Sequence, residues 1–311
     1  MFFSTRISLH AVAGLALLTT SVSLCKAQDK EYVIYAQGKT VTMESMLADL
    51  GKANVVFVGE NHDHKQGHEL ELAILQGLYA HNPKQAFALE MFERDVQPVL
   101  DEYLGDLISE SSFLAASRPW PNYKTDYAPL IQFCKEKKIP VVASNAPRRY
   151  VSMVSRKGPE SLLALPKVSK ANLAPLPYSL EIPAEYDRRL SEIFSTSHGD
   201  TGKAATPNPP AMPNMPSPEN MKRSQELWDC TMADSIARFV RKSHRSVMHI
   251  NGSMHSDSGF GAMDRLRRES PNLKVKNVTI QPSELYPVAP TDLPADSADY
   301  VIVTKAVPEK P

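Results

Sequence analysis

Short, almost continuous apolar runs alternate along this chain with longer segments in which apolar residues recur every three or four positions. The runs that predict strands are at residues 55–58, 86–89, 140–144, 246–250, 275–280 and 300–304. Strands that are apolar at every position are typical of a parallel sheet with helices on both faces. The pattern therefore predicts the α/β class, with a mainly parallel central sheet flanked by helices.

The segments between these runs have helical periodicity. They cover residues 68–79, 96–103, 126–137, 185–193 and 224–243. Before the first predicted strand, residues 32–42 have Gly38 at their centre, a pattern typical of a small hairpin. No internal repeat interrupts the alternation, so we expect residues 28–311 to form a single α/β domain.

Proline is concentrated in one part of the chain. The sequence has 25 prolines against 13 glycines, and ten of the prolines lie between residues 166 and 218. Proline removes a backbone donor and interrupts both helices and sheets. We therefore expect residues 166–218 to be an insertion near one end of the sheet, with a helix at 185–193 followed by a mobile loop.

The first 27 residues predict an export signal. Arg6 supplies a positive start, residues 11–22 are apolar but too short to span a bilayer, and Cys25-Lys26-Ala27 fits a cleavage site. Alternatively, Cys25 becomes the lipidated N-terminus of a bacterial lipoprotein, although the preceding Leu24 is large for that signal. Both interpretations predict an exported protein, either periplasmic or anchored to a membrane and facing the periplasm.

Charge and cysteine content narrow the function classes. The chain has 35 basic and 35 acidic residues, so its formal net charge is zero and nothing favours nucleic acid as a partner. Beyond the leader, Cys134 and Cys230 lie within helical patterns and are expected to be buried small apolar residues. No Cys-x-x-Cys motif is present, which excludes a zinc site made of cysteines.

Polar side chains follow four of the predicted strands. In open parallel sheets, ligands bind at the carboxyl ends of the strands. The residues that the sequence places there are Glu60 and His62, Glu90 and Arg94, Asn145 and Arg148, and His255. Four strands that each deliver ionisable or amide groups to one edge predict a functional site at that edge.

The residue types at this edge suit two kinds of chemistry. His62 and His255, together with Glu60 or Glu90, would serve as acid and base groups for catalysis. The subset His62, His255 and Glu60 would also suit a divalent metal ion. Glu90 has a simpler alternative, a structural ion pair with a nearby arginine.

Two arginines and two further histidines near this edge have other expected roles. Arg94 and Arg148 would bind a carboxylate, such as a propionate, through two hydrogen bonds each. We expect His64 to be a solvated loop residue and His249 to be a hydrogen-bonded core residue within its strand.

Several motifs, in order along the chain, resemble those of the ChaN-like haem-binding proteins. The motifs are Phe-Val-Gly-Glu-Asn-His-Asp at 57–63, Leu-Glu-Met-Phe-Glu-Arg-Asp-Val-Gln at 89–97, Trp120, Asn122-Tyr123, Asp126-Tyr127, Ala-Ser-Asn-Ala-Pro-Arg at 143–148, Leu-Trp-Asp-Cys-Thr-Met-Ala at 227–233 and Asn-Gly-Ser-Met-His at 251–255. The resemblance covers about residues 44–280. The wider superfamily, with TIKI/TraB-type proteins and erythromycin-esterase-like enzymes, shares a Gly-Glu-x-His motif like that at 59–62.

This resemblance implies an exported, iron-regulated protein that binds haem, with haems stacked at a homodimer interface and a tyrosinate ligand to ferric iron. An outer-membrane haem-uptake machinery is an expected partner. The residues expected to bind the haem are Tyr123, Tyr127, Tyr150, Arg94, Asn145 and Arg148. The resemblance does not select one of the three tyrosines. Phe92 and Trp120 are candidates for the apolar walls of a haem slot.

Two functions of different classes therefore remain open. The first is a binding protein that holds haem for capture, storage or uptake without turnover. The second is a hydrolase of an ester or peptide-like bond, with His62 as general base and Glu60, Glu90 and His255 positioning substrate, water or metal. Both functions apply if the polar groups at this edge form an inherited catalytic site beside a newer haem-binding surface.

Overall fold

A computed structural model describes residues 31–178, 182–196, 216–292 and 297–306. These ranges belong to one compact unit, which spans Glu31–Pro311. The predicted export signal and the loop at 197–215 lie outside the described residues. No helix in the described ranges combines the length and apolar character needed to cross a bilayer.

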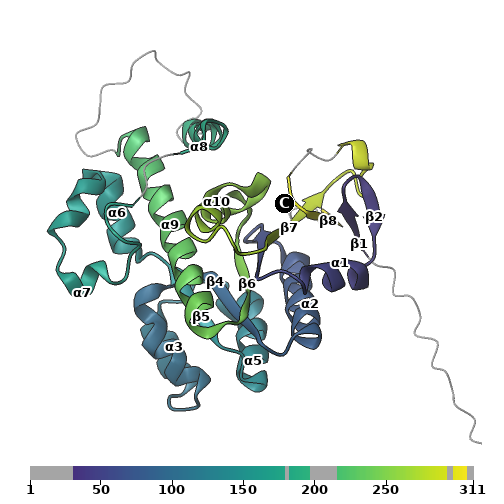
Figure 1. The fold of residues 1–311 in the computed structure, drawn as a ribbon, viewed down its shortest axis with the longest axis horizontal. Coiled ribbons are helices and arrows are strands. Elements are labelled where there is room, and N and C mark those ends of the chain that lie inside the picture. Colours follow the sequence, from purple (N-terminus) through teal and green to yellow (C-terminus); the bar gives the residue numbers. More distant parts are fainter. Residues whose placement is uncertain (1–30, 179–181, 197–215, 293–296, 307–311) are drawn as a thin grey trace, which may run out of the picture. The chain divides into compact units, whose positions relative to one another are not determined.

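Strands and helices alternate along the described chain as the sequence predicts (Figure 1). The strands are β1 (Tyr32–Ala36), β2 (Lys39–Val41), β3 (Val55–Glu60), β4 (Gln85–Glu93), β5 (Val141–Asn145), β6 (Ser246–Gly252), β7 (Val275–Ser283) and β8 (Tyr300–Lys305). The α-helices are α1 (Met43–Leu50), α2 (Lys65–His81), α3 (Gln97–Leu104), α4 (Glu110–Ser117), α5 (Ala128–Lys137), α6 (Arg148–Lys157), α7 (Lys167–Lys170), α8 (Ala184–Thr196), α9 (Pro218–Ser243) and α10 (Gly261–Glu269).

The strands form one eight-stranded sheet in the order β2-β1-β8-β7-β3-β6-β4-β5. From β8 to β5 all neighbouring strands are parallel, which confirms the predicted mainly parallel sheet. The hairpin β1–β2 joins the β8 edge in antiparallel orientation. Its turn contains Gln37 at φ 50° and Gly38 at φ +72°, and glycine is favoured where φ is positive.

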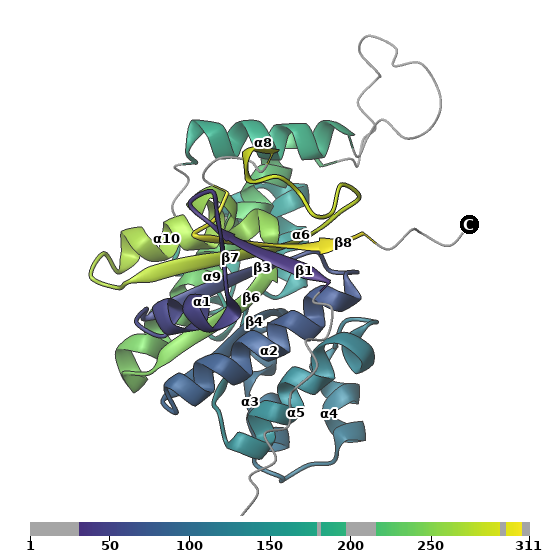
Figure 2. The same ribbon diagram turned by 90° about the vertical axis from the view of Figure 1, so that its right-hand side faces the viewer.

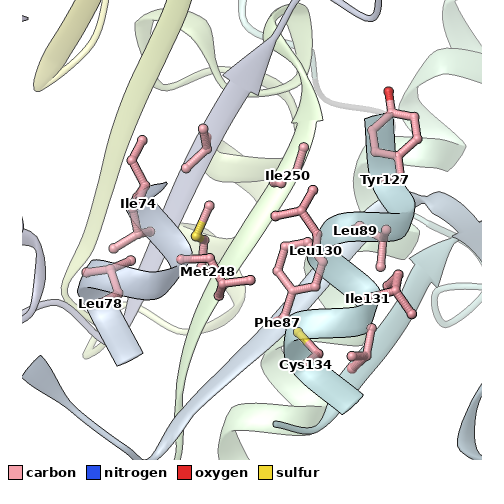
Figure 3. Packing of buried hydrophobic residues seen from close by; sticks show 14 of the residues in the cluster. Ile74, Leu78, Phe87, Leu89, Tyr127, Leu130, Ile131, Cys134, Met248 and Ile250 are labelled. Atoms are coloured by element: carbon pink, nitrogen blue, oxygen red, sulfur yellow. The ribbon is translucent and has the colours of Figure 1, made fainter. Parts of the chain in front are cut away.

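Side chains that alternate along the strands build two separate apolar layers. On one face, Phe87 and Leu89 of β4 and Met248 and Ile250 of β6 pack against α2 and α5 (Figure 3). On the other face, the intervening positions of β3, β4 and β6 pack against α9 and α10. Burial of one large aliphatic or aromatic side chain contributes about 1.5–3 kcal/mol. The two layers therefore explain why apolar residues occupy both faces of these strands.

Several elements differ from their predicted bounds, and three of these differences concern residues of the site or the helices beside it. β4 continues past Leu89 to Glu93, with an irregular register against β5, so Glu90 lies inside the strand. The helix predicted from residue 126 begins as a π-helical turn over Tyr123–Tyr127, followed by α5. α9 starts at Pro218 because Ser217 caps it and proline is favoured in the first turn, so the predicted start at 224 is too late.

The helix predicted at 185–193 is present as α8. It lies beside the N-terminal part of α9 (Figure 2), and the Lys222 ammonium contacts Asp187 at 2.7 Å. Cys134 and Cys230 are buried free thiols, as predicted.

Candidate functional site

The carboxyl ends of β3, β6, β4 and β5 lie side by side in the sheet, and a pocket of about 290 Å³ opens at this edge. The residues that line it are His62, Glu90, Glu93, Trp120, Asn145, Ala146, Arg148, Gln225, Trp228, Met254 and His255. Five of these were predicted as site residues from the sequence: His62, Glu90, Asn145, Arg148 and His255. The rule that polar groups gather at the carboxyl ends of parallel strands thus locates this pocket.

His62 is held on one side of the pocket by Glu60. Nδ1 of His62 lies 2.6 Å from Oε1 of Glu60, and the Tyr127 hydroxyl donates to the same oxygen at 2.6 Å. Trp120 contacts the His62 ring edge to face, with the centroids 4.8 Å apart. Burial lowers the pKa of His62, but the hydrogen bond to Glu60 and the charge of Glu90 outweigh burial and raise it. The imidazole is therefore oriented by a carboxylate and partly open to the pocket.

His255 is held on the opposite side by a longer chain of polar groups. Its Nδ1 lies 2.6 Å from Oδ1 of Asp229 on α9, and the Tyr186 hydroxyl of α8 donates to Oδ2 at 2.8 Å. Its Nε2 lies 3.6 Å from Glu90, whose other oxygen accepts from the Gly252 amide at 2.8 Å. Burial lowers the pKa of His255, but the carboxylates of Glu90 and Asp229 raise it to about 9.

A third cluster lies behind the pocket, where the end of β3 meets α2. Glu60, His68 and Glu71 are buried, and one ligand atom from each lies within 4.8 Å of the others. Burial and the charge of Glu71 raise the pKa of Glu60 to about 8, and burial raises that of Glu71 to about 8.

The metal-ligand set predicted from the sequence was different. The two pocket histidines lie against different carboxylates: His62 against Glu60, and His255 against Asp229 and Glu90. In the described part of the chain, the residues with metal-ligand spacing are Glu60, His68 and Glu71. This set shares Glu60 with the predicted one but has His68 and Glu71 in place of His62 and His255. The reason is that His68 and Glu71 lie on the part of α2 that packs beside Glu60 at the end of β3.

The three candidate tyrosines occupy different environments. Tyr123 is buried among Phe92 and Phe113, and its hydroxyl has no hydrogen-bond partner in the part of the chain that the structure describes. Tyr127 is also buried, and its hydroxyl is bound to a carboxylate. Burial raises the pKa of both phenols. Tyr150, in the first turn of α6, is 7% exposed and is the least buried of the three.

Arg94 does not fill its predicted role as a carboxylate clamp. Its guanidinium forms an ion pair with Asp234 at 2.9 Å and donates to Ser235 and to the backbone carbonyls of Leu173 and Thr231. These bonds occupy Nε and both terminal nitrogens, and the guanidinium does not line the pocket. Its role is to join α9 to the segment before α8.

Other polar and aromatic residues have structural roles. Glu90 contacts His255 and the Gly252 amide instead of pairing with an arginine. Phe92 is fully buried in the core, whereas Trp120 lines the pocket. His249 is buried and hydrogen-bonded within β6, as predicted. His64 lies in the loop before α2, as predicted, but it is half-buried with Nε2 2.9 Å from the Thr304 hydroxyl, so the prediction that it is solvated is wrong.

Sequence reasoning missed Glu71, Asp229 and Tyr186. Glu71 lies two residues after Glu69 on a helix and looks solvated, although it is fully buried. Asp229 lies within the apolar stretch 227–233, and an acid at such a position is a signal that would have found it. Tyr186 belongs to the proline-rich region, for which no pattern predicted a contact with the site.

The sequence matches a family described as haem-binding uptake, Tiki superfamily, ChaN, over residues 46–266. Among solved structures, the chain is similar to ChaN of Campylobacter jejuni, described as showing cofacial haem binding, with 19% identity, 89% of this chain and 98% of that chain covered, and a TM-score of 0.64. This match shows that the fold is ChaN-like.

Two further solved structures are less similar. The type III effector HopBA1 has 9% identity, with 84% of this chain and 92% of that chain covered and a TM-score of 0.45. A mutant erythromycin esterase, EreC, in its open conformation has 11% identity, with 89% and 84% covered and a TM-score of 0.45. No curated protein sequence matches the chain.

Proposed function

This chain belongs to the ChaN family of haem-binding uptake proteins within the Tiki superfamily, and from that premise we propose that it binds ferric haem at the carboxyl edge of its sheet. The observation that carries the proposal is the family match over residues 46–266, which includes every strand end that forms the pocket. The proposed role is haem or iron capture, storage or uptake without turnover.

The side chains at this edge fit a haem by their chemistry. Trp120 and Trp228 offer apolar ring surfaces, and the exposed guanidinium of Arg148 suits a propionate carboxylate. Asn145 adds an amide at the same rim. Pockets for small molecules usually measure about 300–1,000 Å³, so a pocket of about 290 Å³ would hold part of the macrocycle and leave the rest on the surface.

Tyr150 is the tyrosine that we propose as the iron ligand. Ferric haem accepts a tyrosinate as axial ligand, and such a ligand must reach the surface where the haem lies. The Tyr123 hydroxyl is enclosed by the protein and the Tyr127 hydroxyl is bound to Glu60, whereas Tyr150, although also buried, keeps 7% of its surface exposed. Tyr150 belongs to the apolar cluster against which Trp228 packs, and the Arg149 guanidinium lies 4.4 Å from its ring centroid.

A haem that is half outside the pocket needs a second surface to cover it. We propose that two copies of the chain bind haem between them, an arrangement supported by the description of the Campylobacter jejuni ChaN structure as cofacial haem binding. The proposed location is outside the cytoplasm, as the sequence of residues 1–27 suggests, with either periplasmic release or a lipid anchor at Cys25. Haem would then be exchanged with an outer-membrane uptake machinery.

Hemin titration of the purified protein tests this function. We expect a saturable Soret shift at low micromolar hemin and a hemin-dependent increase from monomer to dimer in analytical ultracentrifugation. Arg148→Ala should weaken hemin binding by about 10- to 150-fold, since one charged hydrogen-bonded contact contributes about 1.5–3 kcal/mol. Arg241→Ala on α9 changes an arginine that does not line the pocket and serves as control. A linear, unsaturable absorbance increase would contradict the proposal.

The arrangement of His62 and His255 favours hydrolysis as a second candidate function. Each imidazole is oriented by a carboxylate and faces the same pocket, which is the geometry of a general base held by a third group. His62, with Nδ1 bound to Glu60, presents Nε2 as the proton acceptor for an attacking water. Haem binding through a tyrosine requires neither pair.

Assays with p-nitrophenyl esters and short peptides test this second function. His62→Ala and Glu60→Gln should each abolish any turnover, whereas His81→Ala at the exposed end of α2 should leave it unchanged. Turnover that survives in both site variants would remove the hydrolase interpretation.

A further inference from the structure

The cluster of Glu60, His68 and Glu71 does not line the pocket and has no part in the proposed haem binding, although it shares Glu60 with the His62–Glu60 pair. Glu60 ends β3, and His68 and Glu71 lie three residues apart on α2, so they share one helix face. The three residues are 3%, 5% and 0% exposed. The cluster is thus a set of ionisable groups enclosed by the protein.

The hydrogen bond of His68 to the backbone sets its tautomer. Nε2 of His68 lies 3.1 Å from the carbonyl oxygen of His62, which only accepts, so Nε2 carries the hydrogen. Nδ1 of the neutral ring therefore presents a lone pair. It faces Glu71 Oε2 at 3.1 Å and Glu60 Oε2 at 3.5 Å. A lone pair opposite two carboxylate oxygens is stable only with a proton or a metal ion between them.

The two carboxylates have oxygens that nothing else uses. Glu60 Oε2 and Glu71 Oε1 are buried and have no hydrogen-bond partner among the described residues. Glu60 Oε1, in contrast, is fixed by His62 and Tyr127. Across the described ranges, neither carboxylate has an ion pair with a lysine or arginine. Two ionised carboxylates this close are costly to bury, and either a proton or a cation among these oxygens would remove that cost.

The distances match those of a metal site. Two ligands that each lie about 2.0–2.1 Å from one ion at the tetrahedral angle are about 3.4 Å apart. The two nitrogen–oxygen distances in the cluster, 3.1 and 3.5 Å, bracket that value. A metal-binding histidine also typically donates its second ring N–H to a backbone carbonyl or carboxylate, as His68 does to His62.

We propose that Glu60, His68 and Glu71 form a binding site for a divalent transition-metal ion, with His68 Nδ1 and one oxygen of each glutamate as ligands. One imidazole and two carboxylates suit Zn²⁺, Fe²⁺ or Mn²⁺. Because Glu60 also binds His62 through its other oxygen, the ion would fix the orientation of the imidazole that faces the pocket. This inference does not depend on haem binding.

Metal titration of the chelator-treated full chain tests the site without hemin. We expect one equivalent of Zn²⁺ by elemental analysis, and one equivalent of Co²⁺ with visible bands typical of a four- or five-coordinate ion. His68→Ala and Glu71→Gln should each weaken Co²⁺ binding by at least tenfold. The matched control is Glu69→Gln, an exposed glutamate on the same helix, which should bind as the wild type does.

Two further measurements test where the ion binds. His255→Ala should retain metal binding. If His255→Ala instead lost metal binding while Glu71→Gln kept it, the ion would lie in the pocket and the proposal would be overturned. Should the buried variants fail to fold, X-ray absorption of the Zn²⁺-loaded wild type decides, since we expect a single histidine nitrogen with the remaining ligands oxygen. Two histidine ligands, or no stoichiometric metal in the wild type, would likewise overturn it.

Discussion

The buried histidines His255 and His249 differ in the charge of the groups that surround them. His255 is enclosed with Asp229 and Glu90, and these carboxylates raise its pKa to about 9 after burial has lowered it. His249, in the middle of β6, has only neutral partners, the Ser144 hydroxyl at 3.0 Å and the Asn251 amide oxygen at 3.1 Å. Burial therefore lowers its pKa to about 4. The same residue type is thus kept charged at one site and neutral at the other.

The neutral state of His249 predicts a loss of stability in acid. Its pKa is about 4 in the folded state and about 6.5 when unfolded, so the unfolded state binds more protons between these values. This contribution is fully present above pH ~6.5 and is lost as the pH falls toward 4, to a total of about 3 kcal/mol. Urea unfolding of His249→Gln should lose that part of the pH dependence, and exposed His81→Gln should keep it. Identical pH slopes in wild type and His249→Gln would contradict this assignment.

The sequence predicts the residues of the pocket better than those behind it. Glu60, His62 and His255 follow apolar runs, and the end of a parallel strand is a place where ligand-binding groups are expected. Glu71 and Asp229 lie on helices, where a carboxylate usually faces water. Only the packing of α2 and α9 against the sheet shows that these two are buried, and a single sequence does not contain that packing.

Among the elements, α8 connects the proline-rich region to the candidate site. Tyr186 is buried and donates to Asp229, while its ring stacks on Phe260 with the centroids 5.8 Å apart. Arg189 of the same helix donates to the Ser258 hydroxyl and lies over the Phe260 ring. α8 is therefore docked against α9 and the start of α10 through both apolar and polar contacts.

The Tyr186 hydroxyl should contribute measurably to stability. Tyr186→Phe keeps the ring but removes the hydrogen bond to a charged carboxylate, which is expected to cost about 1.5–3 kcal/mol in the free energy of unfolding. Arg188→Ala on the same helix removes only solvent-exposed ion pairs, which contribute little to stability, and is the control. Urea unfolding compares the two variants, and equal losses would show that the Tyr186 contact contributes nothing of its own.

The edge strand β5 is protected by one side chain of α3. The Gln97 amide nitrogen donates to the Val141 carbonyl at 2.8 Å, and its oxygen accepts from the Ala143 amide at 2.7 Å. Gln97 thereby takes the place of a neighbouring strand for these two residues. Unpaired backbone groups at a sheet edge favour association between chains.

Removal of this contact should destabilise the sheet edge. Gln97→Ala leaves the Val141 carbonyl and the Ala143 amide without their partner, with an expected loss of about 1–3 kcal/mol. Exposed Gln76→Ala on α2 should change stability by less than about 0.5 kcal/mol. Thermal unfolding, with light scattering to detect association, measures both. A Gln97→Ala variant as stable and as monomeric as the control would refute the role of Gln97.

At the scale of the whole molecule, the sequence predicts the class of the fold but not its strand order. Apolar runs such as 55–58 and 246–250 indicate buried parallel strands because both faces of the sheet are covered. The insertion of β6 between β3 and β4 depends on where its connecting helix packs, which no local pattern specifies. The strand order nevertheless decides the site, because it makes β3, β6, β4 and β5 neighbours and so brings His62, Glu90 and His255 into one pocket.

The whole-molecule account also explains why a compact pocket and a large flat ligand are compatible. Helices cover both faces of the sheet through complete apolar layers. The edge of the sheet is therefore the place where a ligand can bind, and α6 begins there, next to the pocket. A haem bound there would contact Arg148 and Tyr150 of α6, and a second copy of the chain would cover its outer face.

The spectrum of hemin bound to Tyr150→Phe tests the central claim most directly. We expect the wild type and Tyr79→Phe, a change at the far end of α2, to show the same Soret maximum and the same tyrosinate charge-transfer band. Tyr150→Phe should lose that band and bind hemin at least tenfold more weakly. An unchanged band and affinity in Tyr150→Phe would contradict ligation of haem iron by α6.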